Sequence, residues 1–192
     1  GHAAARFLGR PFVHYVGNQP NKAEEHFYGL REAVPGLRGV ALFDRLDLRP
    51  ANPGLPMLMW ERREIENYLW FPEVLLAYAR GEGSGDLFGY QEAQHHMEVM
   101  QNILNYLIPR IALDDRNDRW WLDEKASDYL DRIFERYFQE LGLPNLMRKS
   151  GYHQLAKLVP RDLIPDEVRQ KLDTILEVAQ AAEAETNTGG IA

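Results

Sequence analysis

The stretch WERREIENYLWFPEVL, from Trp60 to Leu75, marks a change in the character of the sequence. Before it, short apolar runs alternate with loops. After it, apolar residues recur at helical spacing. The stretch also places three glutamates, Glu61, Glu64 and Glu66, among large apolar side chains. Burying a carboxylate is unfavourable unless it is paired, hydrated or bound to a metal ion. The stretch is therefore either the exposed start of a helix or a segment that brings carboxylates to a site.

The residues before Glu61 predict a small sheet. Three apolar runs, PFVHYVG (11–17), RGVALFD (38–44) and MLMWE (57–61), read as short strands, and residues 22–34 have helical spacing. The runs in this order, with few polar alternations, are typical of parallel strands covered on their faces. We therefore predict an α/β fold in which a small, mostly parallel sheet is followed by a helical half.

The residues after Glu61 predict helices. Their apolar spacing, with proline and acids at helix starts and glycine at helix ends, predicts helices over 63–71, 72–80, 90–108, 127–141, 152–159 and 165–185. The run GEGSGD (81–86) predicts a turn. We predict one domain over residues 3–186, with an α/β part at 11–61, a helical part at 62–186 and a flexible tail at 187–192.

Composition narrows the class of protein. The 192 residues carry 22 Lys and Arg against 29 Asp and Glu, a net charge of -7, so any nucleic-acid role needs a local basic patch, bound cations or another part of a longer chain. The absence of cysteine excludes disulfides and thiolate zinc sites. No apolar run is long enough to span a membrane, and the start, where Gly1-His2 looks like a cloning remnant, is unlike a signal peptide. We expect a cytoplasmic protein without a membrane partner.

Acids follow two of the predicted strands. Asp44 and Asp47 come after the second run, and Glu61, Glu64 and Glu66 come at and after the third. Because ligands bind outside the carboxyl ends of parallel strands, these five side chains are candidate metal ligands. Carboxylates without cysteine suit Mg²⁺ or Mn²⁺, the ions that cleave phosphodiesters in two-metal sites. The alternative is structural: acids in a first helical turn favour its dipole, and neighbouring arginines can pair with them.

Three segments together resemble a known family. GVALFDRLD (39–47), LPMLMWERREIENYL (55–69) and LPNLMRKSGYHQLAKLV (143–159) are similar to the Toprim-type domain that follows the ATPase module in OLD (overcoming-lysogenisation-defect) nucleases and related AAA/ABC-type ATPases. The resemblance covers about residues 12–176. It implies a divalent-metal-dependent nuclease or a relative, often in anti-phage defence. It also implies three partners. The first is nucleic acid, with DNA favoured over RNA. The other two are an ATPase module on the same longer chain and other copies of the chain in a homo-oligomer.

The resemblance assigns roles to particular residues. Asp44 matches the first aspartate of the family's Asp-x-Asp motif, Glu64 and Glu66 match the acids after the next strand, and Lys149 matches a late lysine. Glu64 and Lys149 are the implied catalytic residues. A lysine near a scissile phosphate can offset the negative charge that builds up there.

Two departures from the family pattern leave a second function open. The family's first strand carries a glutamate, but residues 3–10, AAARFLGR, resemble the helix that follows that strand, which suggests a fragment of a longer chain. Leu46 stands in the place of the second aspartate, and Asp47 comes one position late. No G-x-x-x-x-G-K-[ST] motif for ATP is present. The alternatives are a non-catalytic nucleic-acid-binding or assembly domain of an AAA/ABC-type ATPase, or a plain α/β scaffold.

Overall fold

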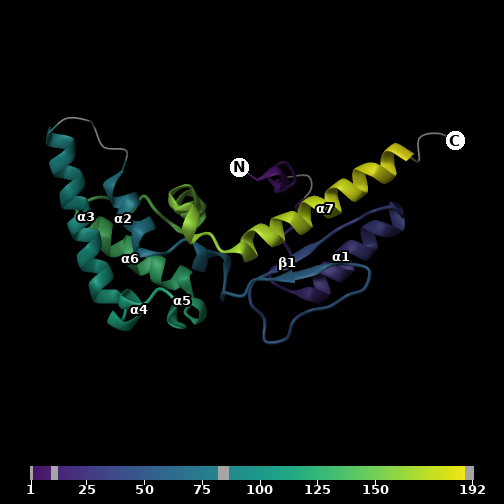
Figure 1. Ribbon diagram of the computed structural model, residues 1–192, viewed down its shortest axis with the longest axis horizontal. Helices are drawn as coiled ribbons and strands as arrows, with labels where there is room; N and C mark the ends of the chain where they lie inside the picture. The colour runs from purple at the N-terminus through teal and green to yellow at the C-terminus, as the bar shows by residue number, and fades with distance from the viewer. Residues whose placement is uncertain (1, 10–12, 82–86, 189–192) are drawn as a thin grey trace. The chain divides into compact units, whose positions relative to one another are not determined.

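The computed structural model describes residues 2–9, 13–81 and 87–188, which are mostly helical with one small parallel sheet (Figure 1). They divide into two compact units. The sheet unit comprises Gly1–Trp60 and Pro165–Ala192, and the helical unit comprises Glu61–Ile164. The division at Glu61 coincides with the change in sequence pattern.

The sheet of the sheet unit has two strands in the described residues. Strands β1 (Ala41–Phe43) and β2 (Met57–Met59) are parallel. Helix α1 (Pro20–Ala33) starts with a proline, whose fixed φ suits the first helical position, and precedes β1. Four side chains form the small core of this unit: Ala23, Phe27, Phe43 and Leu55.

The prediction of a further strand at residues 11–17 is wrong for the part that the structure describes. Residues 13–17 have no strand conformation, and residues 10–12 lie outside the described ranges. In this segment the ring of His14 stacks on His26 of α1, with centroids 3.7 Å apart. The β-rich composition of the run did not suffice, because a strand also needs a neighbour with which to pair.

The C-terminal helix belongs to the sheet unit and not to the helical one. Helix α7 (Asp166–Thr188) packs with the 3₁₀ turn η1 (Ala3–Phe7). The ammonium of Lys171 lies 5.2 Å from the centre of the Trp60 ring, and His2 Nε2 lies 3.0 Å from Asp173 Oδ1. The helix extends through residues 187 and 188 of the predicted tail, and residues 189–192 lie outside the described ranges.

Within the helical unit, most of the predicted helices are present. The elements in chain order are η2 (Ile65–Tyr68), α2 (Pro72–Arg80), α3 (Leu87–Leu107), α4 (Arg110–Asp114), α5 (Trp120–Asp123), α6 (Ala126–Glu140), η3 (Lys149–Leu158) and η4 (Arg161–Leu163). The helices predicted over 63–71 and 152–159 are 3₁₀ segments. Residues 82–86 of the predicted turn lie outside the described ranges.

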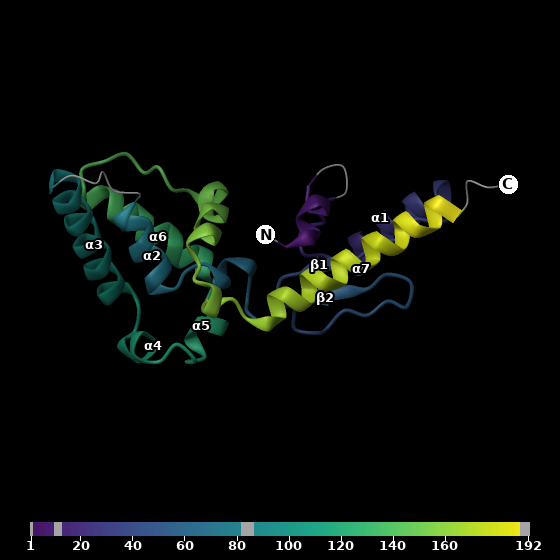
Figure 2. The ribbon, with the colours of Figure 1, turned by 45° about the horizontal axis from the view of Figure 1, so that its top comes forward.

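The core of the helical unit forms around α6, which packs with α3, as α3 does with α2 (Figures 1 and 2). The α6 stripe of Leu130, Ile133 and Phe134 is fully buried. Gly142, at φ +67°, adopts the left-handed conformation that favours glycine just after the helix. None of the described helices combines the length and apolar character required to cross a bilayer.

Candidate functional site

Asp44 lies at the carboxyl edge of the sheet. Phe43, the last residue of β1, is opposite Met59 of β2, and the Trp60 N–H donates to the Phe43 carbonyl over 2.9 Å. The parallel pairing thus ends at Asp44 on one strand and just after Trp60 on the other. Asp44 is half-buried. Its predicted location, just outside the carboxyl end of a parallel strand, is confirmed.

The next residues explain why the second aspartate is displaced. Leu46 packs against the small core of the sheet unit, and its N–H lies 3.1 Å from the sulfur of Met59. Asp47, one position later, is exposed. Leu46 therefore serves the core, and the two aspartates of this segment have different environments.

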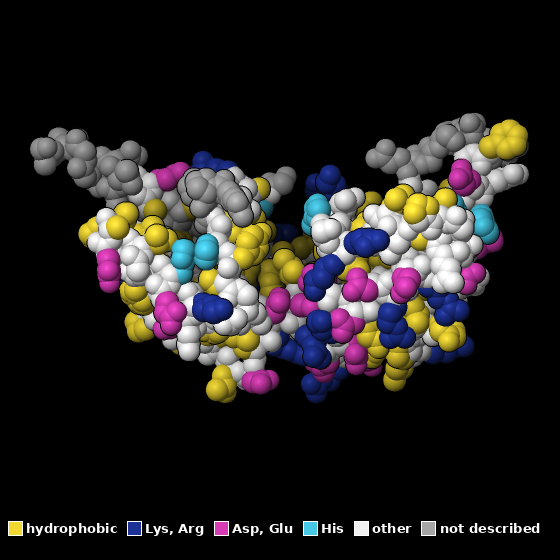
Figure 3. Space-filling model, turned by 180° about the vertical axis from the view of Figure 1, so that it is seen from behind, with side chains coloured by type: hydrophobic (Ala, Val, Ile, Leu, Met, Phe, Trp, Pro, Cys, Tyr) yellow, Lys and Arg dark blue, Asp and Glu magenta, His cyan; other side chains and the backbone are white. Residues whose placement is uncertain are grey.

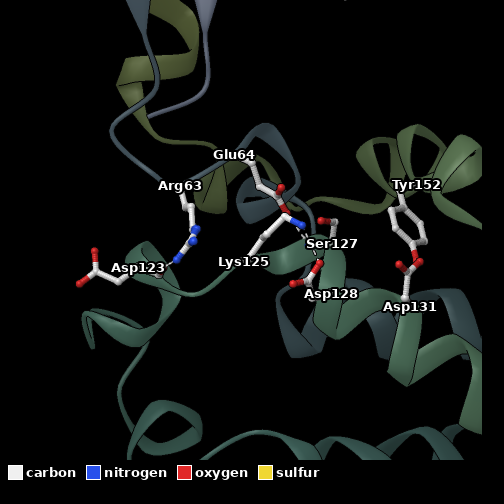
Figure 4. A network of polar contacts seen from close by, with 8 residues as sticks. All are labelled: Arg63, Glu64, Asp123, Lys125, Ser127, Asp128, Asp131 and Tyr152. Carbon is white, nitrogen blue, oxygen red and sulfur yellow. Dashed lines mark hydrogen bonds and ion pairs between the residues drawn. The ribbon is translucent and has the colours of Figure 1, made fainter. Parts of the chain in front are cut away.

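Glu64 is a buried carboxylate in the helical unit. Its side chain is only 6% exposed and accepts a hydrogen bond from the backbone N–H of Ser127, the second residue of α6 (Figure 4). Free N–H groups in the first turn of a helix, together with the helix dipole, favour a negative charge at this position. The carboxylate of Glu64 therefore has a structural role at the start of α6.

Asn67 completes this junction. Its side-chain oxygen accepts from the Glu64 N–H over 3.2 Å, and its amide donates to the carbonyls of Trp121 and Glu124 over 2.9 and 2.8 Å. Asn67 is fully buried, so each of these hydrogen bonds satisfies a polar group that has lost water. The EIENYL segment is thereby fastened to the chain that leads into α6.

The late segment RKSGYHQLAKL contacts the same helix one turn further on. Tyr152 of η3 is buried, and its hydroxyl donates to the carboxylate of Asp131 on α6 (Figure 4). Burial, the hydrogen bond to Asp131 and the negative charges of Asp131 and Glu66 all raise the pKa of Tyr152. Glu66 is therefore close enough to act on Tyr152. Two of the three segments that carry the family resemblance meet on successive turns of α6.

Lys149, the first residue of η3, is exposed. A hydrogen bond from Lys125 is the main cause that lowers the pKa of Asp128; burial opposes it, and the charges of Lys125, Lys149 and Arg63 lower the pKa further. Glu64 contacts the first turn of α6, and the charge of Lys149 acts on Asp128 in that turn.

The predicted metal ligands do not all fall in one unit. Asp44 and Asp47 belong to the sheet unit, whereas Glu61, Glu64 and Glu66 belong to the helical unit. Within the described part of the chain, no group of three or more His, Asp or Glu side chains has an arrangement that could hold a metal ion. The carboxylates of either unit do not by themselves form a ligand set for Mg²⁺ or Mn²⁺, so we derive no reaction step through such an ion.

Several residues of this site escaped the sequence reasoning. Asn67, Ser127 and Asp131 carry the polar contacts of Glu64 and Tyr152. Ser127 and Asp131 lie outside the segments that carry the resemblance, and Asn67 lies inside EIENYL without an assigned role. The position of Ser127 at the start of a helical pattern was the one sequence signal for this contact, because it indicates the first turn of α6, where backbone N–H groups need acceptors. Comparison of the chain with protein-family models, curated proteins and solved structures finds no match.

Proposed function

We propose that the chain is the C-terminal, Toprim-like module of an ATPase-linked nuclease that cleaves phosphodiesters with a divalent metal ion. One observation carries this proposal: the EIENYL and RKSGYHQLAKL segments, which are far apart in the sequence, meet on successive turns of α6. The resemblance requires such a meeting, because it assigns Glu64 and Lys149 to one site. Burial of Tyr152 and Leu155 in the core holds the late segment on α6, and the resemblance gives that position a function.

In this proposal Lys149 supplies positive charge to the phosphate. It is exposed, and none of its interactions within the described residues is an ion pair, so its ammonium is free to approach an anionic ligand. A fixed cation is most effective where negative charge develops in the transition state. Asp44 is the metal ligand with the best support, because it lies at the carboxyl edge of the parallel strands.

Calorimetry and a plasmid-nicking assay with Mn²⁺ test the proposal. The chain should bind Mn²⁺ and convert supercoiled DNA to the nicked form, and Asp44→Asn should abolish both. Asp114→Asn is the matched control, since Asp114 is an exposed acid of α4 that pairs with Arg110 at 3.5 Å. Equal Mn²⁺ binding by the two variants would remove Asp44 from the site. Lack of nicking by the wild-type chain would favour the second candidate function.

The second candidate is a non-catalytic domain that binds nucleic acid or mediates assembly of an attached ATPase. The environment of Glu64 favours it, because a carboxylate engaged with the start of α6 is less available to a metal ion. The displaced Asp47 points the same way. On this reading the chain binds DNA equally well with EDTA and with Mn²⁺ and never cleaves it.

A further inference from the structure

A basic segment stands out in this acidic chain. Between Glu140 and Asp162 the sequence has four cationic residues and no Asp or Glu: Arg148, Lys149, Lys157 and Arg161. The chain as a whole carries a net charge of -7. In the view of Figure 3, Lys and Arg side chains lie among Asp and Glu side chains over the charged part of the surface. We call residues 148–161 the basic segment.

The basic segment is anchored by its apolar side chains. Tyr152 and Leu155 are buried in the core of the helical unit, and the Tyr152 hydroxyl donates to Asp131. Gly151 contributes by close approach, since a β-carbon there would lie 3.0 Å from the sulfur of Met147. These contacts hold the backbone of η3 in place, so little conformational entropy remains to be lost when its outer side chains bind a ligand.

The cations themselves remain available. All four are exposed, and within the described residues none of them forms an ion pair. Several other arginines of the helical unit differ in this respect: Arg110, for example, pairs with Asp114, and Arg119 with Asp123. A group of unpaired cations on an anchored backbone is suited to an anionic partner.

We propose that the basic segment binds the phosphate backbone of DNA. Lys149 and Lys157 are eight residues apart in the sequence of a 3₁₀ segment, a span of about 16 Å at its usual rise. Phosphates recur about every 3.4 Å along one strand of a duplex, so the two lysines can contact the same strand several phosphates apart. The proposal deepens the nucleic-acid role proposed above and rests on it for the choice of ligand.

A lipid surface fits the basic segment less well. Peripheral segments that bind bilayers combine cations with apolar side chains that enter the interface. In the basic segment no large apolar side chain is exposed, because Tyr152 and Leu155 point into the core. The exposed side chains of η3 are instead polar or small, among them His153 and Gln154.

The test is salt-dependent binding of a fluorescein-labelled DNA duplex by the whole chain in EDTA. The variant combines Arg148→Gln, Lys157→Gln and Arg161→Gln and leaves Lys149 in place. Each phosphate that the variant no longer neutralises should lower the slope of log K against log salt concentration by about 0.9. We expect the variant to bind at least about tenfold more weakly at 0.1 M salt, with an unchanged melting temperature.

The control variant combines Arg110→Gln, Arg119→Gln and Arg132→Gln, which removes three exposed charges from the same unit. It should keep both the affinity and the slope. Equal weakening of the two variants, or of neither, would overturn the proposal. Vesicles that contain phosphatidylserine provide a third arm: binding to them, abolished in the first variant, without binding to DNA would replace DNA with a lipid surface. Because no metal is present, this result is independent of Mn²⁺ binding at Asp44.

Discussion

The buried carboxylate of Glu64 accepts a hydrogen bond from the backbone N–H of Ser127, 63 positions later in the sequence. This contact joins the segment where the helical unit begins to the first turn of its central helix. Glu64 is thus both a residue that the family resemblance marks as catalytic and a residue on which local structure depends. Stability and activity measurements on the same variants can separate the two roles.

Substitution of Glu64 should reduce stability by an amount that depends on whether the new side chain can still accept the hydrogen bond from the Ser127 N–H. Glu64→Ala leaves the Ser127 N–H buried without a partner, which should lower the free energy of unfolding by about 1–3 kcal/mol. Glu64→Gln keeps an acceptor and loses only the charge, so it should cost less than about 1 kcal/mol. Urea denaturation followed by circular dichroism measures both. Wild-type stability of Glu64→Ala would show that the contact has no structural role.

Lys149→Ala should remove activity and leave stability unchanged, in contrast to Glu64→Ala, which should reduce stability. An exposed lysine contributes little to folding, so the melting temperature should change by no more than about 1 °C. If Lys149 faces the scissile phosphate, Mn²⁺-dependent nicking of DNA should be lost. Lys125→Ala is a suitable control, because Lys125 also lies at the start of α6 but belongs to none of the family motifs. Full activity of Lys149→Ala would exclude the lysine from the site.

Stability should decrease at high pH because of a buried tyrosine. Burial, aided by the nearby Tyr78, raises the pKa of Tyr137 from 10.0 to about 12. Between these two values the unfolded chain loses the phenolic proton and the folded chain keeps it, so the free energy of unfolding falls as pH rises from about 10 to 12. Tyr137→Phe should reduce this fall, as measured by urea denaturation at pH 9, 10 and 11. An unchanged pH dependence would contradict the assignment.

Asn52 should stabilise the loop between β1 and β2. Its side-chain oxygen accepts from the Tyr28 hydroxyl over 2.7 Å and from the Gly54 and Leu55 N–H groups, and its amide donates to Glu24 over 3.0 Å. Asn52→Ala removes all of these contacts and should lower the free energy of unfolding by about 1–3 kcal/mol. Ala51→Ser, at an exposed neighbour, should have little effect. Hydrogen exchange of the Leu55 amide reports the loop directly.

Local sequence signals predicted the helices well where an apolar stripe and an end signal coincide. Helix α2 has the bounds expected from Pro72 and Arg80, and α6 stops where Gly142 takes a positive φ. The signals failed for residues 11–17, where strand propensity depends on a partner that the sequence does not name. In the same way, the periodicity of α7 revealed a helix but not the unit against which it packs.

The candidate site was predictable only in part, because local sequence patterns do not identify the distant groups with which a residue pairs. The position of Asp44 followed from the rule that parallel strands present their carboxyl ends at one edge. The resemblance assigned Glu64 and Lys149 to one site, but the apolar residues that hold the Lys149 segment on α6, Tyr152 and Leu155, are what fix its position in the structure. The partner of Glu64 is a backbone group, and no side-chain motif identifies such a partner.

The order in which the chain is synthesised has consequences for folding, because the helical unit is one continuous segment whereas the sheet unit consists of two segments that flank it. Residues up to Trp60 emerge from the ribosome before the helical unit, and the α7 residues that complete the sheet unit emerge after it. Domains generally fold as units during synthesis. The helical unit can therefore complete its folding on the ribosome, while the sheet unit must wait with Trp60 uncovered until Lys171 arrives. Translation pauses before residue 165 would lengthen the time in which the apolar side chains of the incomplete sheet unit, Trp60 among them, are open to aggregation.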